Sequence, residues 1–540
     1  MASCATTWDT IIGYENTMIT FSSAPAAITL RKLAENPFDL TASGALTSDR
    51  MKQFHTYGSR LHLFYGTERI TTAVVEALFK LAQEREALTK MKEMQSGLKI
   101  NCSEARAVLH TAIRDLSSPT SKSAKNQEAI TLAKQELEKL KLFLQEIDRE
   151  NLFTDVVQIG IGGSCLGPKC ISHALQYTAK GRRQAHFLSN IDPDAAAKLL
   201  TEINPATTLF IAVSKSGTTM ETLTNVYFVS EHLKKCGVNP KNHLISVTEK
   251  GSPMDDPKKY RRSFYIWDYI GGRYSVSSMV GAVIISSVTG IDTFMEFLQG
   301  AHSMDITALK EDPFYNLPLL SALLNIWNRN FLGFPTKAIL PYSEALLYLP
   351  AHLQQCDMES NGKRIDCKGN KVPFATGPII WGEVGTNGQH SFYQLLHQGT
   401  DVVPSEFIGF KNSQYHMDIQ FEGTSSQNKL LSNLLAQVLA LAVGKSDENP
   451  NKAFPGNRPS RVLFAKQLDP YTLGALLSYF EHTIAFQGFL WGINSFDQEG
   501  VQLGKGIAEQ ILRHFSREGA TEGVKETVAL ASIIECIEGI

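Results

Sequence analysis

Short β-prone runs alternate with helical segments along most of this chain, and this alternation limits the possible folds more than any other feature of the sequence. Apolar runs at 156–161, 209–213, 244–248 and 264–267 have the length and composition of strands, and a helical segment follows each of the first two. Strands that alternate with helices build parallel sheets that carry helices on both faces. The sequence therefore predicts an α/β fold that contains a doubly wound parallel sheet.

A second series of the same kind begins after residue 335. The runs at 337–341, 378–381 and 401–410 have the character of strands, and helices are expected near 349–360 and 389–397. Two doubly wound parallel sheets, each with helices on both faces, are the simplest interpretation of the two series.

The length and composition of the chain support several domains with buried cores. Its 540 residues, of which 43% are hydrophobic and 20% charged, suggest about three or four domain-sized units or two large ones. A turn-rich segment at 116–123 marks the first boundary. The predicted division is a helical N-terminal segment at 1–116 that packs with the second sheet domain, α/β domains at 117–290 and 291–505, and a C-terminal helical arm at 506–540.

The last quarter of the chain contains the longest apolar run, at 430–443. Three polar residues interrupt it, and it is shorter than the roughly 18 apolar residues that mark a membrane span, so we expect a buried helix. The polar segment at 445–461 is expected to be a loop, and helices are expected at 473–488 and 506–514.

Charge and cysteine usage exclude several classes of function. The chain has 52 Lys and Arg against 54 Asp and Glu, so it has no overall positive charge that would bind nucleic acid or an anionic membrane. Its eight cysteines contain no Cys-x-x-Cys pair, which favours free thiols in a reducing compartment over a disulfide framework. The N-terminus lacks the pattern of a signal peptide. We therefore expect a cytoplasmic location.

A glycine-rich loop follows the first predicted strand and leads into a helix, in the order Gly160-Ile-Gly-Gly163-Ser164. Glycines allow the backbone to approach a ligand closely, and free N–H groups at a helix start favour an anion. Cys165 stands where a dinucleotide-binding fingerprint needs glycine, and Pro168 stands where a Walker loop needs lysine. A tight turn without a ligand remains the alternative.

The loop after the second predicted strand is rich in hydroxyl groups. Ser214, Ser216, Thr218 and Thr219 lie between a strand end and a helix start, with Lys215 among them. A phosphate monoester carries about −1.5 to −2 charge, and it is bound well by short donors at a helix N-terminus. Helix capping explains only one or two of the four hydroxyls. The loop therefore predicts a phosphate site.

Two further segments contain residues that could carry out chemistry. Arg273 follows the pair Gly271-Gly272, which permits close approach of a substrate, although a loop arginine is more often part of a surface ion pair. Asp357 and Glu359 end a predicted helix two residues apart, so they point in different directions and do not form an acid pair.

A metal site is the rival interpretation of that helix. His352, Cys356 and Glu359 fall on one helical face and could bind a metal ion, but no fourth ligand is signalled nearby.

The last candidates are a histidine and a pair of polar residues near the C-terminus. His390 is expected in the first turn of a helix, where the helix N-terminus disfavours the imidazolium and suits a proton shuttle; a packing histidine is the alternative. Gln498 and Lys505 are seven residues apart, two helical turns, and are expected on one helical face.

These blocks together resemble the phosphoglucose isomerase (glucose-6-phosphate isomerase) family. The resemblance covers roughly residues 100–510. It rests on Gly160-Ile-Gly-Gly-Ser164, Ser214-Lys-Ser-Gly-Thr-Thr219, Gly271-Gly-Arg-Tyr-Ser275, Asp357-Met-Glu-Ser-Asn-Gly362, Gly385-Thr-Asn-Gly-Gln-His390 and Phe496-Asp-Gln-Glu-Gly-Val-Gln-Leu-Gly-Lys505. It implies two sugar-isomerase (SIS-type) domains and metal-independent interconversion of glucose 6-phosphate and fructose 6-phosphate through an enediolate, in glycolysis and gluconeogenesis.

The resemblance also implies a role for each site residue. Glu359 is the expected base, Arg273 the stabiliser of the enediolate, and His390 with Lys505 the pair that opens the sugar ring. The expected partners are a sugar phosphate and a second subunit that supplies His390, with no cofactor, metal, nucleic acid or membrane. The expected substrate-binding residues are Gly163, Ser164, Ser214, Lys215, Ser216, Thr219, Gly272, Gln355 and Gln498.

A sugar-phosphate sensor is the competing class of function. Such a domain shares the glycine-rich and hydroxyl-rich loops but does not need Glu359, His390, Arg273 and Lys505 together. Their joint presence favours an enzyme.

Overall fold

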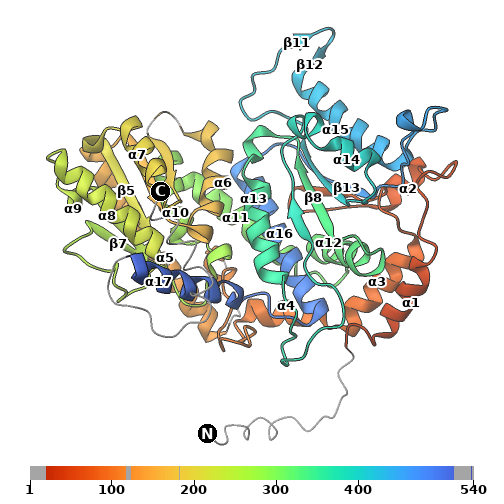
Figure 1. Ribbon diagram of the computed structural model, residues 1–540, viewed down its shortest axis with the longest axis horizontal. Helices are drawn as coiled ribbons and strands as arrows, with labels where there is room; N and C mark the ends of the chain where they lie inside the picture. Colours follow the sequence, from red (N-terminus) through yellow and green to blue (C-terminus); the bar gives the residue numbers. More distant parts are fainter. Residues whose placement is uncertain (1–19, 117–122, 180, 182, 516–536, 538–540) are drawn as a thin grey trace, which may run out of the picture. The chain divides into compact units, whose positions relative to one another are not determined.

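The structure is a computed structural model that describes residues 20–116, 123–179, 181, 183–515 and 537. The chain divides into two units, Met1–Ser495 and Phe496–Ile540. The first unit holds both sheets (Figure 1). The finer boundaries near 116, 290 and 505 stay predictions.

The first sheet has five strands, all parallel, in the order β4-β3-β5-β6-β7. The doubly wound parallel sheet predicted for this part of the chain is therefore confirmed, and the strand predicted at 244–248 is found as predicted. One strand, β4, was not foreseen. The strands are β3 (Asp155–Ile159), β4 (Gln184–Leu188), β5 (Thr208–Val213), β6 (Leu244–Thr248) and β7 (Arg262–Tyr265).

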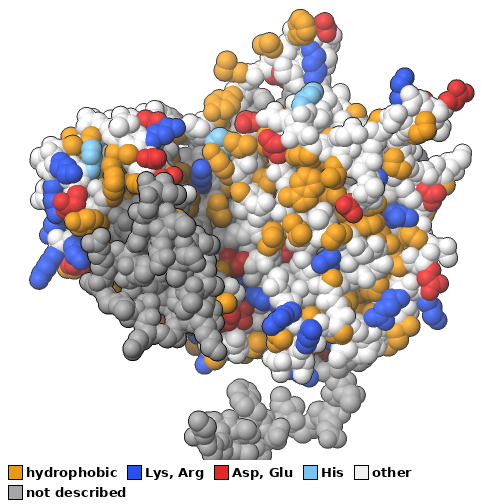
Figure 2. All heavy atoms as spheres, viewed as in Figure 1, with side chains coloured by type: hydrophobic (Ala, Val, Ile, Leu, Met, Phe, Trp, Pro, Cys, Tyr) orange, Lys and Arg blue, Asp and Glu red, His pale blue; other side chains and the backbone are white. Residues whose placement is uncertain are grey.

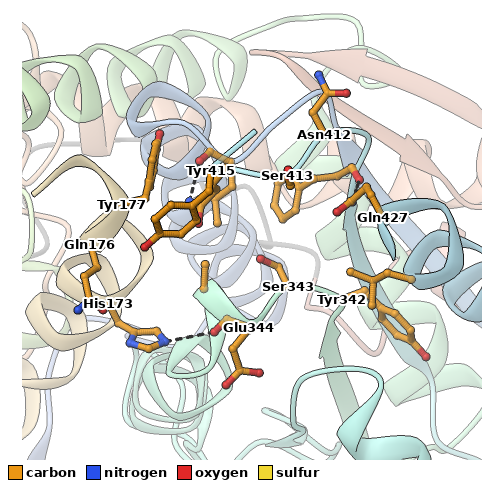
Figure 3. Close-up of a pocket in the computed structure, with 15 residues that line it drawn as sticks. His173, Gln176, Tyr177, Tyr342, Ser343, Glu344, Asn412, Ser413, Tyr415 and Gln427 are labelled. Carbon is orange, nitrogen blue, oxygen red and sulfur yellow. Dashed lines mark hydrogen bonds between the residues drawn. The ribbon is translucent and has the colours of Figure 1, made fainter. Parts of the chain in front are cut away.

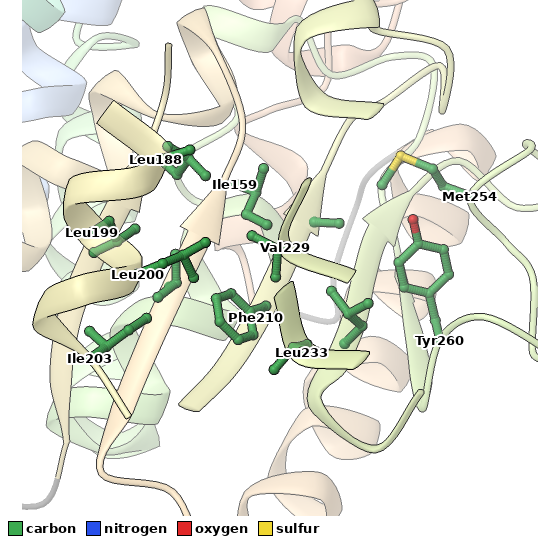
Figure 4. Close-up of a cluster of buried hydrophobic side chains, with 14 residues drawn as sticks. Ile159, Leu188, Leu199, Leu200, Ile203, Phe210, Val229, Leu233, Met254 and Tyr260 are labelled. Carbon is green, nitrogen blue, oxygen red and sulfur yellow. The ribbon is translucent and has the colours of Figure 1, made fainter. Parts of the chain in front are cut away.

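Helices cover both faces of the first sheet because its inner strands, such as β5, are buried on both faces. On one face, Ile159 and Phe210 pack against Leu199 and Leu200 of α7 and Val229 of α8 (Figure 4). On the other face, the side chain of Gln158 donates to the Val280 carbonyl of α10 at 3.3 Å. The helices are α5 (Ala124–Glu150), α6 (Leu166–Ala174), α7 (Pro193–Glu202), α8 (Met220–Lys235), α9 (Pro240–His243) and α10 (Met279–Thr289).

The second sheet has six strands in the order β1-β2-β13-β10-β8-β9. Its last four strands are parallel, whereas β2 runs antiparallel to both β13 and β1. The N-terminal segment was predicted to be helical, so the β1–β2 hairpin corrects that prediction; β13 also begins inside the predicted loop at 445–461. The strands are β1 (His55–Gly58), β2 (Leu61–Phe64), β8 (Thr336–Pro341), β9 (Ile379–Trp381), β10 (Ser405–Phe410) and β13 (Ser460–Ala465).

The helix predicted at 473–488 is α16 (Pro470–Trp491), and every one of its residues from 470 to 491 except Tyr471 is buried. It packs against α11 and α12 to form the centre of the first unit. The remaining helices are α1 (Pro25–Ala34), α2 (Ser48–Gln53), α3 (Thr72–Glu84), α4 (Ala87–Ser96), α11 (Ile291–Thr307), α12 (Leu317–Ile326), α13 (Leu349–Leu353), α14 (Tyr393–Gln398), α15 (Ser426–Val443) and, in the second unit, α17 (Gln502–Phe515).

The prediction of a buried helix at 430–443 was half right. Helix α15 is present, but Leu435, Leu439 and Val443 are 55%, 50% and 47% exposed, so one apolar face is open. The β11–β12 hairpin before it, at 420–425, extends outward with hydrophobic side chains on its surface (Figures 1 and 2). Within the described ranges, no helix has the length and apolar character needed to cross a membrane.

Candidate functional site

The glycine-rich and hydroxyl-rich loops lie side by side at the carboxyl edge of the first sheet. The chain moves from β3 to β4 on one side and then to β5 on the other, so the strand order reverses between β3 and β5. In open α/β sheets, ligands bind outside the carboxyl ends of the strands at such a point. A Cβ on Gly160 would lie 3.1 Å from the carbonyl oxygen of Val213, which shows how close the two loops are.

The hydroxyl-rich loop is held in shape by its own side chains. Ser214 Oγ accepts from the amide of Gly217 at 3.1 Å and lies 2.8 Å from Thr219 Oγ1. Ser216 Oγ lies 2.8 Å from Thr218 Oγ1. Thr219 is the N-cap residue of α8, yet its side chain makes no capping hydrogen bond. Helix capping therefore does not explain the hydroxyls, and the N-terminus of a 16-residue helix faces this loop.

The sequence predicts that Lys215 binds the substrate phosphate, but its side chain bonds to backbone carbonyl oxygens. Its Nζ donates to the carbonyl oxygens of Asp268 at 2.8 Å and Ile270 at 3.0 Å. Burial lowers the pKa of this lysine. In the described structure its side chain therefore connects the hydroxyl-rich loop to the loop that precedes Arg273.

The glycine-rich loop touches the Arg273 loop so closely that only glycine fits at position 163. A Cβ on Gly163 would lie 2.3 Å from the carbonyl carbon of Gly272 and 2.8 Å from the amide nitrogen of Arg273. Ser164, the next residue, ends the short 3-10 turn Gly162–Ser164. This contact brings the predicted residues Gly163, Ser164, Gly272 and Arg273 together.

Arg273 and Glu359 form an ion pair at the centre of this region. Nη1 of Arg273 lies 3.2 Å from Oε1 of Glu359; the arginine side chain is 2% exposed and the glutamate side chain 20%. The guanidinium also donates from Nε to Ser360 Oγ at 2.6 Å and from Nη2 to the Ser495 carbonyl at 2.7 Å. A buried cation beside a partly open carboxylate can hold negative charge on a ligand while the carboxylate moves a proton.

Glu359 is the last residue of a π-helical turn, Gln354–Glu359, that continues α13. Gln355 in the same turn reaches the glycine-rich loop, since its Nε2 lies 3.2 Å from the position a Cβ on Gly162 would occupy. The Asp357 side chain has different partners: its carboxylate accepts from Asn361 at 2.9 Å and from Gln487 at 3.3 Å, and burial raises its pKa. The two carboxylates therefore point to different partners, as their two-residue spacing predicts.

The rival metal interpretation finds little geometric support. Cys356 Sγ lies 3.5 Å from His352 Nε2, and both residues are buried, but the carboxylate of Glu359 is paired with Arg273. Among the described residues, no group of three or more His, Cys, Asp or Glu side chains is arranged to bind a metal ion.

His390 does not occupy the predicted position at the start of a helix. It ends a 3-10 turn, Asn387–His390, and helix α14 begins three residues later at Tyr393, so the argument from the helix N-terminus does not apply to it. The turn is attached to the end of β8 by a 2.7 Å hydrogen bond from Gln389 to the Tyr342 hydroxyl. His390 is exposed, and in the described part of this single chain no hydrogen bond or ion pair joins it to Arg273 or Glu359.

Gln498 and Lys505 belong to the second unit. Gln498 precedes a 3-10 turn, Glu499–Val501, and only Lys505 lies within α17. The prediction that the two residues share one face of one helix was therefore wrong, because the helix begins after Gln498.

Two further residues lie in the site, but the sequence did not indicate a role for them. Ser360 and Tyr274 lie inside the quoted motifs. Ser360 Oγ accepts from Arg273 Nε, and the Tyr274 hydroxyl lies 2.7 Å from Ser360 Oγ. The available signal was a hydroxyl directly after Glu359 and another directly after Arg273.

A separate cavity of about 330 Å³ lies at the carboxyl ends of β8 and β10 (Figure 3). His173 lies on one side of it, with its Nε2 3.2 Å from the Glu344 carbonyl oxygen. Its other lining residues include Tyr177, Ser343 and Ser413, and none of the lining residues is Lys or Arg. None of the site residues predicted from the sequence lines this cavity.

Comparisons with known proteins agree with this geometry. A family model described as phosphoglucose isomerase matches residues 64–529. Proteins named glucose-6-phosphate isomerase from Protochlamydia amoebophila (strain UWE25) and Chlamydia pneumoniae are 53% and 51% identical to this chain, over 92% and 89% of it and 94% and 92% of their own lengths. The crystal structure of a glucose-6-phosphate isomerase from Chlamydia trachomatis D/UW-3/Cx has a TM-score of 0.92 at 46% identity, covering 95% of this chain and 100% of that one.

Proposed function

The chain belongs to the phosphoglucose isomerase family, and on that premise we propose that it interconverts glucose 6-phosphate and fructose 6-phosphate, the isomerisation used in glycolysis and gluconeogenesis. The observation that carries the mechanism is the ion pair of Glu359 with the buried Arg273, beside the two loops at the strand-order reversal. These loops can hold a phosphate at one end of a sugar while the pair acts at the other.

The phosphate is held by neutral donors. Ser164, Ser214, Ser216 and Thr219 supply hydroxyl groups, and the N-terminus of α8 adds backbone N–H groups and a favourable dipole. Gly163 and Gly272 allow the backbone to come close to the substrate. Because the phosphate fixes one end of the sugar, the reacting carbons are held in one orientation, which lowers the entropic part of the barrier.

Lys215 supports this site through the backbone. It bonds to the carbonyl oxygens of Asp268 and Ile270, so it keeps the phosphate loop and the arginine loop in contact and adds positive charge to the region. Its own ammonium group is engaged by those carbonyls.

Isomerisation moves one proton from C2 to C1 and a second from the O2 hydroxyl to O1. Glu359 removes the proton from C2 of the open-chain aldose and, as the carboxylic acid, returns it to C1. Between these steps an enediolate carries negative charge on oxygen. Arg273 stabilises that charge, and because a guanidinium stays protonated at all working pH values, it needs no proton transfer of its own.

The sugar ring must open before the isomerisation, and the remaining residues predicted from the sequence act in this step. We assign His390 and Lys505 to the proton transfer between the ring oxygen and the O1 hydroxyl, and Gln355 and Gln498 to hydrogen bonds with sugar hydroxyls. Support for Gln355 comes from its side chain, which reaches the glycine-rich loop. His390 is exposed and so is accessible to a substrate.

A coupled assay tests the function directly. Purified protein should convert each sugar phosphate into the other, and excess EDTA should leave the rate unchanged, because Arg273 supplies the fixed positive charge that a metal ion would otherwise provide. Binding of glucose 6-phosphate without turnover would instead support a sugar-phosphate sensor. Loss of activity with EDTA, restored by zinc or manganese, would support the alternative hypothesis of a metal site at His352, Cys356 and Glu359.

We further propose that the protein acts as a homodimer in the cytoplasm, with His390 supplied to the site of the other subunit. Two observations support the second subunit: no hydrogen bond or ion pair joins His390 to Arg273 or Glu359 in the described single chain, and α15 leaves Leu435 and Leu439 open. The described cysteines are free thiols, which agrees with a reducing compartment.

Subunit complementation tests the supply of His390. Glu359→Gln and His390→Ala variants should each be inactive, but co-expressed and purified as a mixture they should regain about a quarter of wild-type activity, because half of the dimers are mixed and each has one complete site. A mixed dimer as inactive as its parents would show that both residues act from the same chain.

A further inference from the structure

The hydrogen bonds of Arg273 differ in length in an informative way. Two of them, at 2.6 and 2.7 Å, go to neutral oxygens, Ser360 Oγ and the Ser495 carbonyl. The contact with the Glu359 carboxylate is longer, at 3.2 Å, although hydrogen bonds between opposite charges are usually 2.7–2.9 Å. The neutral oxygens therefore define the plane of the guanidinium, while Glu359 is held less tightly.

Ser360 connects Arg273 to a second hydroxyl. Its Oγ accepts from Arg273 Nε and lies 2.7 Å from the hydroxyl of Tyr274. Ser360 is 0% exposed and Tyr274 1% exposed. A buried hydroxyl that loses its partner cannot replace it with water, so this pair resists rotation.

Tyr274 is itself fixed by ring stacking. Its ring lies 4.9 Å from the ring of His110 with 15° between the planes. Burial raises the pKa of Tyr274, and burial together with the nearby charge of Arg114 lowers the pKa of His110. Both rings are therefore neutral at neutral pH, and the Tyr274 hydroxyl meets Ser360 as a neutral group.

We propose that Tyr274 and Ser360 are positioning residues that fix the guanidinium of Arg273 relative to Glu359, an inference that rests on the catalytic roles proposed above. Ser360 directly follows Glu359, so one turn of the chain carries both the base and the anchor of the arginine. Spacing between the carboxylate and the guanidinium is thereby set through the backbone. The phosphate is proposed to bind to other residues, so we expect this pair to affect kcat more than substrate affinity.

Removal of either hydroxyl should lower kcat more than it changes KM. A displacement of about 1 Å in a catalytic group can cost roughly 10²-fold in rate, so we expect Ser360→Ala to lose about 10- to 100-fold in kcat and Tyr274→Phe a smaller factor. Tyr274→Phe keeps the ring on His110 and leaves the serine bonded to Arg273. If Ser360→Ala does not fold, Tyr274→Phe still tests the proposal.

A matched control exists in the same unit. Ser321 and Tyr479 form another fully buried hydroxyl pair, with Ser321 Oγ near the Tyr479 hydroxyl, on α12 and α16. Ser321→Ala removes an equally buried serine hydroxyl, but it does not touch Arg273. It should lower the melting temperature and leave kcat near the wild-type value.

A double-mutant cycle with Arg273→Lys identifies the residue through which Ser360 acts. If Ser360 works by holding the guanidinium, adding Ser360→Ala to Arg273→Lys should cause little further loss of kcat. An equal loss in both backgrounds, or a kcat for Ser360→Ala equal to that of Ser321→Ala, would overturn the proposal. A crystal structure of Ser360→Ala should also show the guanidinium displaced from its present plane, and an unmoved guanidinium would contradict it.

These outcomes are distinct from failure of the proposed function. A wild-type protein without isomerase activity would overturn the function, and the crystal structure of Ser360→Ala would still decide the positioning role. An active wild type in which Arg273→Lys is impaired and Ser360→Ala is not would overturn the positioning role alone.

Discussion

Replacement of Glu359 by Gln should lower kcat by about 10²- to 10⁴-fold, the usual cost of losing a general base. The amide keeps the size of the side chain and can still accept from Arg273, but it cannot take the proton from C2. The measurement is kcat in the coupled assay together with the uptake of deuterium from solvent at C1 and C2. Both should fall together in this variant.

Asp357→Asn is the matched control for this substitution. Asp357 lies two residues away in the same π-helical turn, but its carboxylate bonds to Asn361 and Gln487 in the buried interior. We expect the Asp357→Asn variant to keep proton exchange with solvent at C1 and C2, while the stability of the folded protein changes. If exchange is normal in Glu359→Gln and lost in Asp357→Asn, the base has been assigned to the wrong carboxylate.

Arg273→Lys should lower kcat by about 10²-fold, although the charge is conserved. Loss of one donor to a developing oxyanion costs about 10²–10³-fold in well-studied enzymes. Lysine cannot bond simultaneously to Ser360, Ser495 and Glu359, as the guanidinium does through Nε, Nη2 and Nη1. Steady-state kinetics should show the loss mainly in kcat, because the phosphate is bound elsewhere.

Arg458→Lys gives the comparison for this prediction. Arg458 is also buried, and it donates to the carbonyl oxygens of Asp401 and Gly399 at 2.7 and 2.6 Å. Its replacement should lower the melting temperature and leave kcat unchanged. Near-normal turnover in Arg273→Lys, with a fall only in stability, would mean that Arg273 is structural like Arg458.

The parallel strands were predictable wherever they are apolar throughout. β6, at Leu244–Thr248, is buried along its full length, and so is β5, so continuous apolar runs identified both. β4, at Gln184–Leu188, is an edge strand whose first four residues are not fully buried, and it therefore lacks such a run. Its polar residues gave no reason to expect a strand.

Buried charge concealed the strand β13. Arg461 within it is fully buried, because it pairs with Glu406 of β10 at 2.7 Å and donates to Asn325. These partners are far apart in sequence, so an arginine after a proline- and glycine-rich segment looked like the end of a loop. The surrounding positive charges outweigh the effect of burial and lower the pKa of Glu406 to about 2, so this pair stays ionised inside the core.

The site was predicted well as a set of residue types and less well as a set of contacts. Sequence position at strand ends was enough to place Gly163, Ser214 and Thr219 at one edge of a sheet. It could not show that Lys215 turns toward carbonyl oxygens, since one-dimensional order does not give the direction of a long side chain. The open face of α15 was equally beyond prediction, because hydrophobicity alone does not reveal whether an apolar side chain is covered.

The most direct test of the central claim is a crystal structure of the Glu359→Gln variant with bound fructose 6-phosphate. A group that moves a proton between two carbons must be able to reach both, so we predict the side chain at 359 within about 3–3.5 Å of C1 and C2 of the open-chain sugar. The phosphate should lie against Ser214 and Thr219. A sugar whose first two carbons lie far from residue 359, or closer to another carboxylate, would contradict the account.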